Sequence, residues 1–146
     1  MSCRFAAYLL ALLAAMSCAR PSMVEEYRLV DERDSTGRFS YDLDLSDSAS
    51  VYDLLFYTRF DCPSKTFSAL EDLQVNVELV SPSGTVYGET VYIPVSGFKS
   101  DKRGTYDSKV EYRRGLVPVE CGIWEMKLAV PQTKGLRGIG VINVKR

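Results

Sequence analysis

The sequence contains no histidine among its 146 residues. Histidine is the most common general base near neutral pH and the most common zinc ligand in proteins. Its absence excludes nucleophilic sites of the Ser–His and Cys–His types. No catalytic residue, metal site or cofactor is therefore predicted, and the sequence favours a protein that is not an enzyme.

A hydrophobic stretch long enough to cross a membrane is also absent. The longest apolar run, residues 5–16, would cover about 18 Å as a helix, whereas the hydrocarbon core of a bilayer is ~30 Å thick. This run follows a single basic residue, Arg4, and small residues come after it. The pattern is typical of a secretory signal peptide.

The signal ends at a cysteine. Ala15, Met16 and Ser17 precede Cys18, and bacterial lipoprotein signals resemble this: their cysteine is acylated and becomes the first residue of the mature protein. We therefore expect a signal peptide over residues 1–17 and lipidation at Cys18. Fatty acyl chains such as palmitate would hold the protein in the lipid bilayer, with about 0.8 kcal/mol for each buried CH2. Ordinary cleavage nearby and a retained membrane anchor are the alternatives.

The mature part carries little net charge. Loss of Arg4 with the signal leaves 17 basic and 19 acidic residues, and no basic stripe indicates nucleic-acid binding.

Of the four cysteines, Cys62 and Cys121 remain once the signal and the lipidated residue are set aside. In an oxidising compartment such a pair is a disulfide candidate, so we expect a Cys62–Cys121 bridge. Two buried thiols that pack as small hydrophobic groups are the alternative.

Apolar and polar residues alternate along much of the chain, which is the period of a half-buried β-strand. Strands are expected at residues 38–45, 51–60, 73–80, 85–95, 108–114, 122–130 and 138–145. A tight turn at residues 81–84 joins two of them as a hairpin. Trp124 begins an apolar stripe and is expected in the core. A helical turn is expected at residues 68–72, because Ser68 and Glu71 resemble a capping box.

Short strands that each present one apolar face need a second sheet to cover that face. The expected fold is therefore all-β: an antiparallel β-sandwich, jelly-roll or Ig-like, of about seven to eight strands after the N-terminal signal peptide. Residues 18–26 are expected to form a tether, and residues 27–146 the β-sandwich domain.

The chain is rich in tyrosine, with nine in all. Five of them are expected to be exposed and to form a binding surface: Tyr57, Tyr87, Tyr92, Tyr106 and Tyr112. A tyrosine ring offers a large contact area at low entropy cost, which suits the recognition of glycans or proteins. Cross-strand packing within the sheets is the alternative explanation for these tyrosines.

Three sequence segments follow the cysteine and its tether: SVYDLLFYTRF, SALEDLQVNVELVSPSG and GIWEMKLAVPQTKGLRGIGVINVK. In this the chain resembles the GldH-type lipoproteins of Bacteroidetes, which are associated by name with gliding motility. The positions that match the terminal block of that family are Gly122, Trp124, Leu136, Gly138, Ile139 and Gly140. Residues 85–115 depart from the family pattern, which usually has a longer segment there with Trp and Gly. The family has no established catalytic residues, so the resemblance implies none here.

Together these features predict a lipoprotein of the bacterial cell envelope, anchored in the outer membrane through Cys18. It would act without catalysis, as an accessory or interaction subunit with envelope protein partners. A surface module on the same anchor that binds glycans or another ligand is the alternative.

Overall fold

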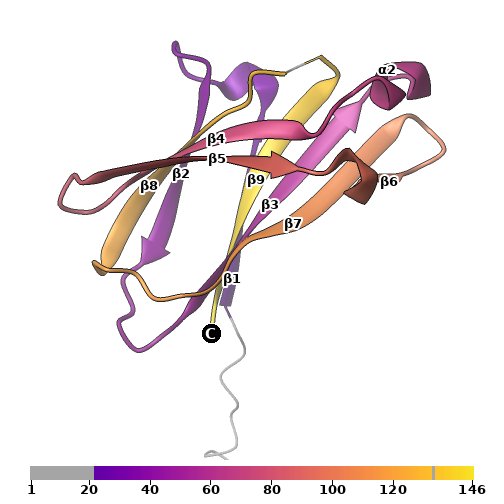
Figure 1. Cartoon of the computed structure of the whole chain (residues 1–146). Coiled ribbons are helices and arrows are strands. Elements are labelled where there is room, and N and C mark those ends of the chain that lie inside the picture. The colour runs from indigo at the N-terminus through magenta and orange to yellow at the C-terminus, as the bar shows by residue number, and fades with distance from the viewer. Residues whose placement is uncertain (1–21, 133) are drawn as a thin grey trace, which may run out of the picture.

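The computed structural model describes residues 22–132 and 134–146, which form two antiparallel sheets packed face to face (Figure 1). One sheet has the order β1-β9-β3-β7-β6 and the other β2-β8-β4-β5. The strands are β1 (Ser22–Leu29), β2 (Arg38–Leu45), β3 (Tyr52–Asp61), β4 (Leu73–Val80), β5 (Val86–Ile93), β6 (Lys99–Ser100), β7 (Thr105–Leu116), β8 (Gly122–Ala129) and β9 (Leu136–Lys145). Short helical turns are η1 (Val30–Glu32), α2 (Ser64–Ser68) and η2 (Val95–Gly97). The predicted all-β sandwich is confirmed.

The strands pair as one long hairpin folded over on itself. β4 pairs with β5 next to the tight turn, and the pairs β3–β7, β2–β8 and β1–β9 follow outward along the chain. Successive pairs lie in alternate sheets. This nested arrangement is the topology of a jelly roll, one of the two types of sandwich that the sequence left open.

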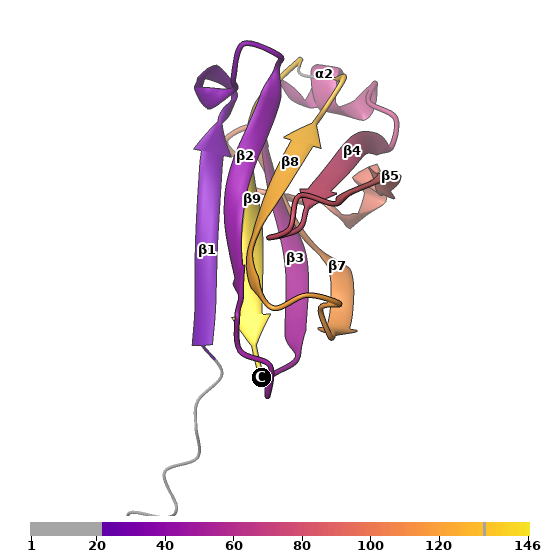
Figure 2. The same cartoon turned by 90° about the vertical axis from the view of Figure 1, so that its left-hand side faces the viewer.

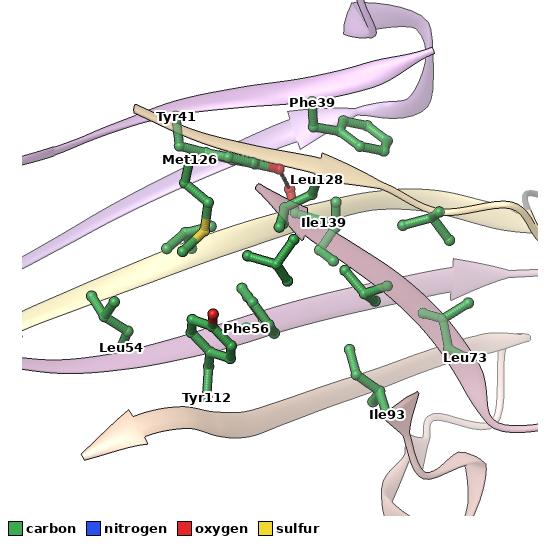
Figure 3. Packing of buried hydrophobic residues seen from close by; sticks show 14 of the residues in the cluster. Phe39, Tyr41, Leu54, Phe56, Leu73, Ile93, Tyr112, Met126, Leu128 and Ile139 are labelled. Carbon is green, nitrogen blue, oxygen red and sulfur yellow. Dashed lines mark hydrogen bonds between the residues drawn. The ribbon is translucent and has the colours of Figure 1, made fainter. Parts of the chain in front are cut away.

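The core lies between the sheets and is filled by every second residue of the strands, as the alternation predicts. Figure 3 shows Phe39 and Tyr41 of β2 beside Met126 and Leu128 of β8, and each of the four is at most 1 % exposed. Trp124 is 5 % exposed, which confirms its predicted place in the core.

The domain begins earlier than predicted. Residues 22–26, assigned to the tether, belong to β1, which pairs with β9 from Ser22 to Leu29. β1 is an edge strand whose first four side chains are all exposed, so its sequence lacks the alternation that marks a half-buried strand. The expected signal peptide and Cys18 lie outside the described residues.

The predicted helical turn is displaced toward the N-terminus. Helix α2 spans Ser64–Ser68 and follows Pro63, rather than residues 68–72. The Ser68 hydroxyl donates a hydrogen bond of 2.7 Å to the carbonyl oxygen of Ser64, so Ser68 ends the helix instead of capping its start. None of the helices in the described part of the chain has the length and hydrophobicity that a membrane span requires.

Candidate functional site

An apolar pocket opens where the edge of the second sheet, β5, faces β7 of the first sheet. Its volume is about 240 Å³. Five leucines line it, contributed by β2, β3, β4 and β7: Leu43, Leu45, Leu54, Leu79 and Leu116. Residues 117–119 of the loop between β7 and β8 border the same pocket. The pocket therefore exposes part of the core to a ligand that enters from the side of the sandwich.

Two aromatic rings form one wall of the pocket. The ring of Tyr87 in β5 lies 5.9 Å from the ring of Trp124 in β8. The indole N–H of Trp124 donates a 2.8 Å hydrogen bond to the carbonyl oxygen of Glu120, and the Ser83 hydroxyl donates one of 2.7 Å to the Glu120 carboxylate. The wall is thereby tied to both the β4–β5 turn and the β7–β8 loop.

A polar cluster of three side chains adjoins this wall. The Tyr112 hydroxyl and the Arg113 guanidinium both donate hydrogen bonds to the same carboxylate oxygen of Glu89. The guanidinium carbon of Arg113 lies 4.4 Å from the centre of the Tyr112 ring, a cation–π contact. Tyr112 also stacks on Phe56 in the core, with ring centres 4.7 Å apart (Figure 3).

Protonation states in this cluster follow from its contacts. The hydrogen bond from Tyr112 and the charge of Arg113 lower the pKa of Glu89 below its ordinary value. Burial, together with the Glu89 carboxylate, raises the pKa of the Tyr112 phenol far above its ordinary value. At neutral pH the cluster thus holds one carboxylate, one neutral phenol and one guanidinium. These groups satisfy one another, so the cluster suits the orientation of a bound group better than proton transfer.

The five predicted tyrosines do not form one surface. Tyr87 and Tyr112 line the pocket, Tyr92 lies on the outer face of the second sheet, and Tyr57 lies half-buried on the outer face of the first. The predicted exposure of Tyr106 and Tyr112 is wrong, because they are 8 % and 9 % exposed. β7 runs from Thr105, so the alternation turns the even-numbered residues 106, 108 and 112 inward. Tyr106 stacks on Phe67 of α2, with ring centres 3.7 Å apart.

The expected disulfide is wrong as well, since Cys62 and Cys121 are both free. Cys62 follows the last residue of β3, whereas Cys121 precedes Gly122, which lies opposite Leu45 at the end of β2. Because β2 and β3 are consecutive and run in opposite senses, these positions fall at opposite ends of the sandwich. Ten residues of strand span roughly 30 Å, and a disulfide requires Cα atoms within about 7 Å.

The sequence analysis missed Glu89, Arg113 and residues 117–119. Glu89 was detectable in principle: it occupies the same side of β5 as Tyr87 and Val91, and a charged residue in a core-facing register indicates an edge or a site. The Val-Pro-Val loop at residues 117–119 belongs to the site only because it lies beside the pocket, and no local sequence pattern predicts that position. No group of three His, Cys, Asp or Glu residues is placed to hold a metal ion within residues 22–132 and 134–146.

No protein-family model matches this chain, and no curated protein sequence matches it at a significant level.

Proposed function

We propose that the protein is a lipoprotein of the bacterial cell envelope, anchored to the outer membrane through acylated Cys18, and that its jelly roll is a non-enzymatic interaction subunit. The resemblance to GldH-type lipoproteins supports an accessory role in an envelope assembly such as a gliding or secretion apparatus. The observation that carries the proposal is the apolar pocket between β5 and β7, which is lined by five leucines and three aromatic rings and is open to an incoming group.

A partner protein suits this pocket. Leucine and aromatic side chains bind an apolar side chain without further chemistry, and the ionised cluster around Glu89 can orient the polar backbone that carries it. The lowered pKa of Glu89 leaves that carboxylate unsuited to act as a general acid. A glycan platform is less well supported, because the exposed tyrosines Tyr87 and Tyr92 lie on different faces of β5.

Two tyrosines of β5 provide a matched test of the pocket. Tyr87 is 46 % exposed and lines the pocket, whereas Tyr92 is 63 % exposed on the outer face of the same strand. After cross-linking in cells, we expect Tyr87→Ala to reduce cross-linked envelope partners by about tenfold, since loss of a central aromatic contact costs ~1.4 kcal/mol or more. Tyr92→Ala should leave the yield unchanged. Equal yields from both variants would contradict binding through the pocket.

Anchoring is tested separately. Cys18→Ala removes the acylation site, so we expect the protein to move from the membrane fraction to the soluble fraction. Mass spectrometry of the wild-type mature protein should find the fatty acyl groups on Cys18. A non-acylated mature N-terminus, or membrane fractionation that does not change in the variant, would refute the lipoprotein assignment.

A further inference from the structure

We propose that the end of the sandwich where β1 begins lies against the membrane, and that residues 117–119 insert into its lipid interface. This inference rests on the proposed anchoring through Cys18. It assigns a second role to the β7–β8 loop, which also borders the apolar pocket.

Strand register places the start of the domain and this loop at the same end. Ser22 of β1 lies opposite Lys145 in β9, and Lys145 lies opposite Tyr52 in β3. Tyr52 lies opposite Leu116, the last residue of β7. These four residues thus form one row across the sheet, and residues 117–119 follow directly. In Figure 2 the start of β1, the C-terminus and the end of β7 all lie toward the lower end of the molecule.

Chain length brings this end close to the bilayer. Three residues lie between Cys18 and Ser22, and the four steps from Cα to Cα span at most about 14 Å even when fully extended. Three strand spacings of about 4.8 Å separate Ser22 from Leu116 across the sheet, again roughly 14 Å. An acylated Cys18 in the membrane therefore keeps the row of strand ends within reach of the lipid headgroups.

Several apolar side chains are exposed at this end. Val117 is 67 % exposed and Val119 is 83 % exposed, and Met23 and Val24 at the start of β1 are 61 % and 57 % exposed. Pro118 stands between the two valines and has no backbone N–H, which leaves the loop one fewer donor to desolvate in lipid. Val119 has the largest exposed fraction of the large hydrophobic residues in the described chain. We infer that the bilayer covers these side chains.

Two basic residues at this end are paired with carboxylates, which bears on the type of membrane contact. Arg146 lies 2.8 Å from the Asp53 carboxylate, and Lys145 lies 3.6 Å from that of Asp47. Asp53 also accepts a 2.7 Å hydrogen bond from the backbone N–H of Gly115, which fixes the base of the loop. Since Arg146 and Lys145 are already neutralised, exposed Arg114 is the basic residue beside the loop that can still contact lipid headgroups, and we expect the contact to be mainly hydrophobic.

A tryptophan placed in the loop tests the inference. The lipidated full-length mature protein with Val119→Trp is reconstituted into vesicles that contain brominated phosphatidylcholine, which quenches tryptophan within the bilayer. The natural Trp124 is buried and contributes a constant background. The matched control is Lys102→Trp in the exposed turn that links β6 to β7 at the opposite end, since Asp61 at the end of β3 lies opposite Thr105.

We expect strong quenching and a blue-shifted emission for Val119→Trp, because interfacial side chains lie about 5–10 Å deep. Lys102→Trp should behave like the wild type. The Val119→Trp result should be the same with and without phosphatidylserine and at high salt. Equal quenching of the two variants would overturn the docking proposal. Absence of quenching at residue 119 would also overturn it, and this is the result expected if a second copy or a partner protein covers the loop instead of lipid. Flotation of the same vesicles reports anchoring independently: protein that floats without quenching refutes only the docking, and protein that does not float refutes the anchor.

Discussion

The hydroxyl of Tyr41 in β2 donates a hydrogen bond of 2.5 Å to the carbonyl oxygen of Ile139 in β9, across the interior of the sandwich (Figure 3). The two strands belong to different sheets, and the residues lie 98 positions apart in the chain. Tyr41 is 1 % exposed, and burial raises the pKa of its phenol far above the ordinary value. The group therefore remains a donor at any physiological pH and fixes one sheet against the other.

Loss of this hydrogen bond should destabilise the fold measurably. Tyr41→Phe keeps the ring but leaves the Ile139 carbonyl without the phenol, so we expect the free energy of unfolding to fall by about 1–2 kcal/mol. Urea unfolding followed by circular dichroism provides the measurement. Tyr92→Phe, at an exposed position, should change stability by less than about 0.5 kcal/mol. Equal effects would show that the Tyr41 bond contributes nothing specific.

Gly138 in β9 is required by the close approach of β1. A Cβ atom at this position would overlap the backbone carbonyl oxygen of Arg28 and the ring of Tyr27. Backbone cannot move aside as a flexible side chain can, so Gly138→Ala should cost roughly 3 kcal/mol. The control is Gly97→Ala, where a Cβ would meet no atom within 4 Å and φ is not in the left-handed region. Thermal unfolding should separate the two variants clearly, and similar melting temperatures would contradict the packing of β1 on β9.

The Glu89 cluster should make part of the stability depend on pH. Its folded-state pKa lies below the ordinary value of 4.5, so the unfolded state binds a proton more readily than the folded state. The resulting stabilisation is fully present above pH 4.5 and is lost as the pH falls through the lower folded-state value. We expect Glu89→Gln to cost about 0.5–1 kcal/mol at pH 7, because the pair is partly exposed, and to cost progressively less in acid.

Urea unfolding of the wild type and of Glu89→Gln at several pH values between 7 and 3 measures this difference. The matched control is Glu25→Gln, at an exposed position of β1. A difference between wild type and Glu89→Gln that stays constant across this range would show that the ionised carboxylate is not the stabilising species.

The two thiols should react at different rates. Cys121 is exposed, whereas Cys62 is half-buried and its pKa is raised by burial and by the nearby Asp61. Because the thiolate is the reactive form, we expect iodoacetamide to modify Cys121 first in the folded, non-reduced protein, and Cys62 more slowly. Peptide mass spectrometry over time distinguishes the sites, and Cys121→Ser should remove the fast phase alone. Failure of both thiols to react without a reductant would contradict the assignment of both as free thiols.

Local patterns in the sequence predicted the strands with good accuracy. Phe39, Tyr41 and Leu43 point inward as their alternation requires, and the turn at residues 81–84 forms through the hydrogen bond from Gly84 N–H to the Ser81 carbonyl. These features depend on neighbours within a few positions, so a single sequence is sufficient to reveal them. β1 was not predicted, because an edge strand with exposed side chains has no such periodicity.

The candidate site was predictable only in part. Tyr87 and Tyr112 were identified, but as members of an exposed surface rather than as the wall and edge of a pocket. Glu89 and Arg113 lie 24 positions apart in the chain, and their contact depends on how β5 and β7 face each other. The prediction of anchoring at Cys18 and the resemblance to GldH-type lipoproteins remain predictions.

The sequence alone determined that this chain would form strands with one buried face, because alternation every two residues is a local property of an extended backbone. Tertiary structure decided which strands pair, that the pairs nest as a jelly roll, and that Cys62 and Cys121 lie at opposite ends. It also decided where the apolar pocket and the Val-Pro-Val loop meet. Such relationships depend on contacts between residues far apart in the chain, for which alternation carries no information.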